Sequence, residues 1–313
     1  MQAPFRQLPL AARLAFIPAF YLVNTGVLYF LGSFIAHQFM GIEDTSALMQ
    51  GTFSTEHEAY VFLFLQALFS LGGFMLSAVL FTYFETGTVK QSMHLNRWPH
   101  FRLLLLALLA ILAAQPLIEL LVQLSKSLTS APALQPLRDI EQKEEVFMEK
   151  LLQFTSLGRF FVTATVIALV PALSEEFFFR GLIMRTLLRS KMNVALSIIV
   201  TGFIFALVHM QLSNFVAIWV LGSFLGYLYY ISGSLWLPIM AHFINNFLTV
   251  LFKYLFNNGY LSSDLANAST PLWLTILGTV IFGLCIFMFY KWQEKAEFAD
   301  IQLPINTEPT LYE

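Results

Sequence analysis

Eight long runs of apolar residues set the strongest limit on how this chain can fold. The hydrocarbon core of a bilayer is about 30 Å thick, and a helix needs about 20 predominantly apolar residues to cross it. The runs cover residues 14–36, 59–84, 101–124, 158–188, 192–210, 214–231, 235–256 and 272–290. We therefore predict an all-α, polytopic protein with about eight transmembrane helices, integral to a cell or inner membrane.

Composition supports the same class. Of the 313 residues, 58% are hydrophobic and 12% are charged, whereas a soluble domain carries roughly 25% charged residues. The net charge is -2, and no cluster of Lys or Arg points to a nucleic-acid partner. The single cysteine, Cys285, excludes an internal disulfide framework and a cysteine-rich metal site. No Walker-type loop or Gly-rich dinucleotide motif occurs, which argues against ATP-driven transport by this chain alone.

Positive residues predict how the spans are oriented. Eight spans place both termini on one side of the membrane, and most of the lysines and arginines fall in the segments on that side. The positive-inside rule therefore places both termini in the cytoplasm. The predicted segments are 1–124 with three N-terminal transmembrane helices, 125–157 as an external amphipathic loop, 158–256 as a core of four helices, 257–291 with the last transmembrane helix, and 292–313 as a cytoplasmic polar tail.

The loop at 125–157 contains an amphipathic pattern. Over residues 138–156, the apolar residues that share one helical face are Ile140, Phe147, Leu151 and Phe154. The acidic residues that occupy the rest are Asp139, Glu141, Glu144, Glu145 and Glu149. This pattern is typical of a helix that lies in the membrane interface with its charged face in water.

The third span carries a polar stripe near its end. Gln115, Glu119 and Gln123 are spaced four residues apart and therefore share one helical face. The stripe is either a polar face packed against a neighbour near the membrane surface, or a set of side chains that supports a site or lines a substrate path.

Two adjacent carboxylates and an arginine lie inside the apolar run at 158–188. A charged residue at the centre of a membrane helix costs about 2.5–3.5 kcal/mol on insertion scales, so such residues are expected to be paired, functional or both. Glu176 and Arg180 are four residues apart and can form an ion pair on one face of the helix. Glu175 points about 100° away from Glu176 and is free to face a cavity.

The next span brings a histidine to the height of Glu175. Phe205 and His209 share one face of this span, and the turn before it is predicted near 189–192. At 1.5 Å per residue, Glu175 lies about 21 Å from the turn and His209 about 25 Å. The difference is less than one helical turn, so the two side chains can meet if the helices pack antiparallel.

A later span adds two more polar side chains. His242 and Asn246 are four residues apart and share a face, whereas Asn245 is turned aside. Together these residue types suit peptide hydrolysis: Glu175 and His209 could take a proton from water, and His242 and Asn246 could donate hydrogen bonds to the oxyanion. Alternatively, Glu175, His209 and His242 could ligate a divalent metal such as zinc with a bound water. The residues leave both schemes open.

Three motifs in this order resemble a known family. Glu-Glu-x-x-x-Arg (Glu175, Glu176, Arg180), Phe-x-x-x-His (Phe205, His209) and His-x-x-x-Asn (His242, Asn246) look like those of the CPBP family. Its members are the CAAX prenyl endopeptidase and bacteriocin-processing membrane proteases, also called the Abi family. The resemblance covers about residues 155–255 and includes the eight-span layout.

The resemblance implies an intramembrane endopeptidase whose catalytic core is the predicted four-helix segment. Glu175 and His209 would activate water, and His242 and Asn246 would hold the oxyanion. Glu176, Arg180 and Phe205 would support them. The family is described both as metal-dependent and as a glutamate-type protease without metal, so the two schemes stay open.

The expected substrate is a membrane-embedded or lipid-modified polypeptide, and no nucleic-acid partner is expected. One alternative is a non-catalytic membrane protein of the same fold, with an immunity or regulatory role. Another is a proton-coupled transporter that uses the buried carboxylates and histidines as relay groups.

Overall fold

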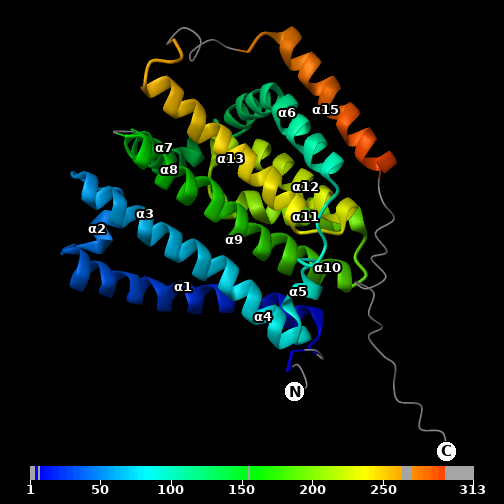
Figure 1. Cartoon of the computed structure of the whole chain (residues 1–313), viewed down its shortest axis with the longest axis horizontal. Helices are drawn as coiled ribbons and strands as arrows, with labels where there is room; N and C mark the ends of the chain where they lie inside the picture. Colours follow the sequence, from blue (N-terminus) through cyan, green and yellow to red (C-terminus); the bar gives the residue numbers. More distant parts are fainter. Residues whose placement is uncertain (1–3, 6–7, 154–155, 263–269, 293–313) are drawn as a thin grey trace, which may run out of the picture.

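The computed structural model describes residues 4–5, 8–153, 156–262 and 270–292 (Figure 1). Within these ranges the chain forms helices and turns and contains no strand, which confirms the predicted all-α class. The predicted polar tail at 292–313 lies outside the described residues from position 293 onward.

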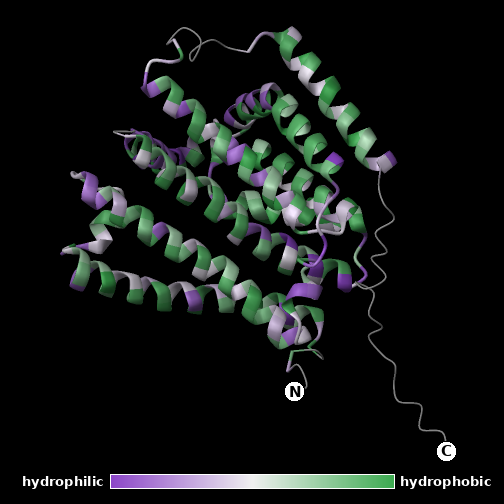
Figure 2. Ribbon diagram, in the orientation of Figure 1, coloured by the Kyte–Doolittle hydropathy of each residue, from purple (hydrophilic) through white to green (hydrophobic). Residues whose placement is uncertain are grey.

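Seven helices in the described ranges are long and apolar enough to cross a membrane. They are Leu10–Met40 (α1), Glu56–Thr86 (α3, η1 and α4), Phe101–Leu128 (α6), Leu157–Arg189 (α8 to α10), Leu212–Ser232 (η5 and α12), Trp236–Asn257 (α13) and Leu272–Trp292 (α15). Apolar residues dominate the outer helices α1 and α15, as expected for surfaces that face lipid (Figure 2).

The predicted span at 192–210 is shorter than expected. It is α11 (Val194–His209), an apolar helix of 16 residues. At 1.5 Å per residue it is about 24 Å long, less than the roughly 30 Å of a hydrocarbon core. The part of the chain that the structure describes therefore has seven spans of full length and one short helix, where the sequence predicted about eight spans.

The helix Leu157–Arg189 is continuous over 33 residues and contains two π-helical segments between its α-helical parts. It consists of α8 (Leu157–Ala164), η3 (Thr165–Leu169), α9 (Val170–Phe178), η4 (Phe179–Met184) and α10 (Arg185–Arg189). Both η3 and η4 are π-helical. Single π-helical turns are frequent at functional sites and shift side chains away from the positions that an α-helix would give them. In this chain they flank the α9 segment that carries the two glutamates.

The second span is also interrupted by a π-helical turn. It comprises α3 (Glu56–Ser70), η1 (Leu71–Leu76) and α4 (Ser77–Thr86). A capping box of Thr55 and Glu58 starts α3. In η1, a Cβ on Gly72 would lie 1.5 Å from Cδ1 of Leu28, so glycine is what lets α1 pack closely here.

The shorter elements lie between the spans. They are α2 (Thr45–Met49), α5 (Val89–Ser92), η2 (Pro132–Leu134) and α7 (Gln135–Leu151). In α7, the helix predicted to lie on the membrane, the Phe147 ring packs edge-on against Phe53 and Phe62 at 5.5 and 4.7 Å between centroids. Leu151 is fully buried. Part of the apolar face of α7 therefore covers the protein at the start of α3.

The connections gather at two ends of the bundle (Figure 1). At one end, Trp236 and Ser234 donate hydrogen bonds to the carbonyls of Leu95 and Arg97. At the other end, Glu141 of α7 accepts hydrogen bonds from Ser213. Short as it is, α11 runs from the first end to the second, because it begins just after α10 and leads into η5 (Leu212–Asn214).

Close packing of α11 against α12 (Phe215–Ser232) sets the position of the helix that carries His209. A Cβ on Gly202 would lie 2.7 Å from the backbone nitrogen of Ser223, and one on Gly222 would lie 3.2 Å from the Cα of Gly202. Small residues at such a contact let two helix backbones approach within the membrane. The core beneath this contact includes the fully buried side chains of Phe179, Phe205 and Tyr229.

Candidate active site

Glu175 lies on α9 and faces two histidines. Its Oε2 is 3.9 Å from Nε2 of His209 on α11 and 3.9 Å from Nε2 of His242 on α13. The structure thus brings together three of the side chains that the sequence singled out, from three different helices. A separation of 3.9 Å is too long for a direct hydrogen bond, and it leaves room for a bridging water.

The Oε2 atom of Glu175 is buried and has no hydrogen-bond partner among the described residues. The side chain as a whole is 14% exposed, and that of His209 is 27% exposed. Leaving a buried acceptor unpaired costs about 1–3 kcal/mol, and more for a charged group. Such an atom is expected at a functional site or where a water binds.

A hydrogen bond to the backbone determines the tautomer of His209. Its Nδ1 lies 2.7 Å from the carbonyl oxygen of Phe205. A carbonyl only accepts, so Nδ1 carries the proton and donates it. In the neutral imidazole, the lone pair is then on Nε2, the nitrogen that faces Glu175.

Glu176 connects the other histidine to the buried arginine. Its Oε1 accepts a hydrogen bond from Nη1 of Arg180 at 2.5 Å and lies 2.9 Å from Nδ1 of His242. Arg180 also donates from Nη2 to the carbonyl oxygen of Gly222 on α12, at 2.6 Å. The predicted ion pair of Glu176 with Arg180 is therefore present. Glu176 also contacts His242, which the helical spacing of residues 175–180 did not predict.

This arrangement limits how His242 can act. The side chain is 4% exposed, and its Nδ1–H donates to the Glu176 carboxylate. A neutral His242 would then have its lone pair on Nε2, so it can donate from Nε2 only as an imidazolium. Two carboxylates and one guanidinium lie in this cluster beside His242.

Phe205 forms the apolar floor of the site. It is fully buried, and its ring centroid is 4.4 Å from that of His209 and 5.8 Å from that of His242. The guanidinium carbon of Arg180 lies 5.0 Å from the same ring, in cation–π geometry. Phe205 therefore packs against both histidines and the arginine at once.

Asn246 makes no direct hydrogen bond with the other predicted site residues in the described part of the chain. It lies one helical turn after His242 on α13 and is half-buried. Its Oδ1 accepts a hydrogen bond from Nδ2 of Asn245 at 3.4 Å. Among the described residues, no hydrogen bond joins Asn246 to Glu175 or to either histidine.

The residues do not fit a metal centre as they are arranged. In the described part of the chain, no group of three or more His, Cys, Asp or Glu side chains is placed so that it could hold a metal ion. This applies to the alternative ligand set of Glu175, His209 and His242.

A second buried charge cluster holds the end of the same helix. The fully buried Glu85 at the end of α4 forms ion pairs with Arg13 of α1 at 3.0 Å, Arg185 at 2.5 Å and Arg189 at 3.1 Å. Because the last two residues belong to α10, the cluster attaches the helix of Glu175 to α1 and α4. The sequence signal for this cluster is an acid, Glu85, directly after the apolar run 59–84.

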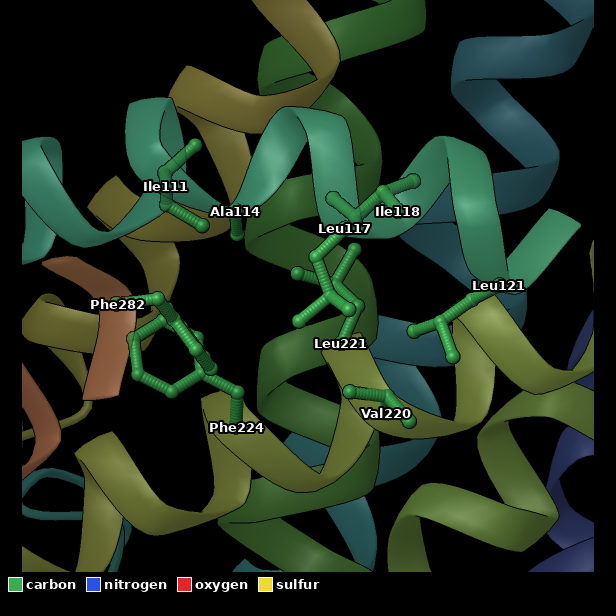
Figure 3. A pocket seen from close by; sticks show the side chains of 9 residues that line it. All are labelled: Ile111, Ala114, Leu117, Ile118, Leu121, Val220, Leu221, Phe224 and Phe282. Carbon is green, nitrogen blue, oxygen red and sulfur yellow. The ribbon is translucent and has the colours of Figure 1, made fainter. Parts of the chain in front are cut away.

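An apolar pocket lies elsewhere, between α6, α12 and α15 (Figure 3). It is lined by Ile111, Ala114, Leu117, Ile118, Leu121, Val220, Leu221, Phe224 and Phe282, and its volume is about 20 Å³. None of these side chains is titratable, and apolar cavities stay dry. The pocket is therefore not the place where water would be activated.

Comparison with known families gives a match to the part of the chain that carries these residues. A family model described as Type II CAAX prenyl endopeptidase Rce1-like matches residues 157–248. Comparisons with curated proteins and with solved structures found no match. The matched range begins with α8, ends within α13 and contains Glu175, His209, His242 and Asn246. Residues 157–248 of this chain are therefore a domain of the Rce1-like CAAX prenyl endopeptidase family, within the CPBP (Abi) group.

Proposed function

We propose that this protein is an intramembrane endopeptidase that hydrolyses a peptide bond in a membrane-associated or lipid-modified polypeptide. One observation carries the proposal. The Oε2 atom of Glu175 is buried, lacks a hydrogen-bond partner among the described residues, and faces Nε2 of both His209 and His242 at 3.9 Å.

The reacting water would sit between Glu175 and His209. Hydrogen bonds of about 2.8 Å from a water to each of two atoms are compatible with the observed 3.9 Å between those atoms. Because Nδ1 of His209 donates to Phe205, Nε2 is the atom that accepts from this water. The water would thus be held by two acceptors, with its oxygen lone pairs directed to the substrate.

Hydrolysis would follow a general-base scheme. The Glu175 carboxylate takes a proton from the water as the water oxygen forms a bond to the scissile carbonyl carbon. The carbonyl π electrons move to the oxygen and give a tetrahedral oxyanion. When the C–N bond breaks, its electron pair stays on nitrogen, and the proton held by Glu175 passes to that nitrogen. The products are a free amine and a carboxyl group.

His242 and Asn246 would donate hydrogen bonds to the oxyanion. His242 would act from Nε2 as an imidazolium, with Glu176 accepting from Nδ1 and fixing the ring. Arg180 would keep the Glu176 oxygen in place. Removal of one such donor in other enzymes costs about 10²–10³ in kcat.

Two observations support the proposed substrate class. The matching family model is described as a CAAX prenyl endopeptidase, and the site lies among long apolar helices. A polypeptide anchored by a lipid would reach the site within the bilayer. We place both termini in the cytoplasm, since most of the positive residues lie in the segments on their side.

A cleavage assay on the full chain in lipid vesicles tests the proposal. The probe is a farnesylated peptide that ends in a Cys-aliphatic-aliphatic-X sequence and carries a fluorophore and a quencher on either side of the scissile bond. The wild type is expected to cleave it, and Glu175→Gln is expected to lower kcat by about 10²–10⁴.

A second readout covers substrates of other sequence. The termini of membrane-associated polypeptides are compared between cells with wild-type protein and cells with Glu175→Gln. If neither the peptide nor any cellular polypeptide is cleaved in a Glu175-dependent way, the proposal is wrong. The non-catalytic alternative would then stand.

A further inference from the structure

The polar stripe on α6 reaches the helix of the proposed oxyanion donors. Gln115 uses its Nε2 amide group twice: it donates to the backbone carbonyl of Ile111 at 3.0 Å and to Oδ1 of Asn245 on α13 at 3.4 Å. Glu119, one turn further on, instead accepts hydrogen bonds from Thr270 ahead of α15. Gln115 therefore links α6 to the catalytic domain near Asn246.

Asn245 passes this link on to Asn246. Its Nδ2 donates to Oδ1 of Asn246 at 3.4 Å. A side-chain amide has an accepting end and a donating end, so an Asn246 whose oxygen is occupied by Asn245 directs its Nδ2 elsewhere. The described residues contain no hydrogen-bond partner for that Nδ2.

The backbone carbonyl of Ile111 sets which end of each side-chain amide donates and which end accepts, along Gln115, Asn245 and Asn246. The oxygen of Ile111 can only accept, so it fixes the donating end of Gln115. Gln115 then donates to the oxygen of Asn245, and this leaves the Asn245 nitrogen for Asn246. Each amide thus fixes the orientation of the next one, and the Asn246 amide is left with its N–H groups free to donate.

We propose that Gln115 and Asn245 are positioning residues that orient the Asn246 amide, so that its Nδ2 and not its Oδ1 faces the developing oxyanion. The inference rests on the proposed function. The two ends of an amide have almost the same shape, so packing alone does not select the donating end. The wrong end would place oxygen lone pairs against the oxyanion and remove one of its two donors.

Substitutions that reverse the polarity of the amide chain test this inference. Asn245→Asp keeps the shape and still accepts from Gln115, but it cannot donate, so the Asn246 amide would turn its nitrogen toward the introduced carboxylate. We expect kcat to fall by about tenfold or more, toward the roughly 10²–10³ of a lost oxyanion donor. KM should change by less than about twofold.

Gln115 provides an independent pair of variants. Gln115→Glu reverses the polarity at the start of the chain of amides, whereas Gln115→Met removes the amide without adding an acceptor. We expect the larger loss of kcat from Gln115→Glu, although glutamate is closer to glutamine in shape. A purely structural role would give the opposite order, with a matching fall in the thermal unfolding midpoint.

The decisive measurement is made in the Asn246→Ala background, with the full chain in vesicles and the farnesylated peptide as substrate. There, Asn245→Asp should cause no further loss of kcat, because the amide that it turns is absent. A further loss in that background, or an unchanged kcat for Asn245→Asp alone, would overturn the inference. A wild-type kcat for Asn246→Ala itself would overturn both the inference and the proposed oxyanion donor.

Discussion

Nδ1 of His242 lies 2.9 Å from Oε1 of Glu176, the same oxygen that accepts from Arg180. Two adjacent carboxylates on one helix thus have different surroundings. Glu176 is fully buried and holds an arginine and a histidine. Glu175 faces two histidine rings without a direct hydrogen bond. Replacing each glutamate by glutamine should therefore affect cleavage and thermal stability differently at the two positions.

Glu175→Gln and Glu176→Gln form a matched pair. Glu175→Gln should lower kcat by about 10²–10⁴. It should leave the thermal unfolding midpoint unchanged or higher, because Oε2 of Glu175 has no hydrogen-bond partner among the described residues. Glu176→Gln should lower the midpoint, because it leaves the buried Arg180 without this counter-charge. Loss of one partner of a buried ion pair costs about 3–5 kcal/mol. Equal shifts in the two midpoints would contradict the assignment.

Arg180→Lys should not behave as a conservative change. The guanidinium donates from two different nitrogens, to Glu176 and to the carbonyl of Gly222, and it covers the ring of Phe205. A lysine ammonium lacks the planar fork needed for this combination. We expect a loss of about 1–3 kcal/mol in the free energy of unfolding, measured by thermal or denaturant unfolding in detergent. An unchanged stability would show that the contact with Gly222 is dispensable.

Gly202→Ala should disturb the site through helix packing. The added Cβ would lie 2.7 Å from the backbone nitrogen of Ser223, so α11 and α12 must separate and shift His209. Overpacking of this kind costs about 1–3 kcal/mol, and kcat should fall with it. Gly283→Ala on α15 is the matched control, because no described residue outside its own helical turn has an atom within 4 Å of the added Cβ. If both variants behaved like the wild type, close packing at Gly202 would not matter.

Glu85→Gln should loosen the end of the helix that carries Glu175. The change removes the carboxylate that Arg13, Arg185 and Arg189 share and leaves these arginines with less compensation. We expect a loss on the order of 3–5 kcal/mol in stability, read as a lower unfolding midpoint. Molecules that remain folded should keep their KM, since the cluster is attached to α10 and not to Glu175. A selective change in KM with no loss of stability would point to a role in substrate binding instead.

Local periodicity explains what could be predicted of this site from the sequence. Residues four apart share a helical face, and this is why the Glu176–Arg180 pair could be foreseen. Similar distances from a short turn predicted Glu175 and His209 at nearly the same height, and the structure brings them to 3.9 Å from each other. The long apolar runs likewise predicted helices, since a spanning helix requires about 20 such residues.

Only the tertiary structure decided the contacts between helices that are distant in the chain. Glu176 meets His242 across 66 positions, and Arg180 meets Gly222 across 42. The π-helical turns on either side of α9 rotate side chains away from α-helical spacing, and α11 is shorter than the span predicted at 192–210.

The sequence by itself thus determined the helical membrane class and the polar side chains that share each helical face. The tertiary structure determined which faces meet, and with them the partners of Glu176, Asn245 and Gln115. The physical reason is that a helical face follows from the fixed 3.6-residue period, whereas the rotation and depth of one helix against another depend on the packing of all the side chains between them.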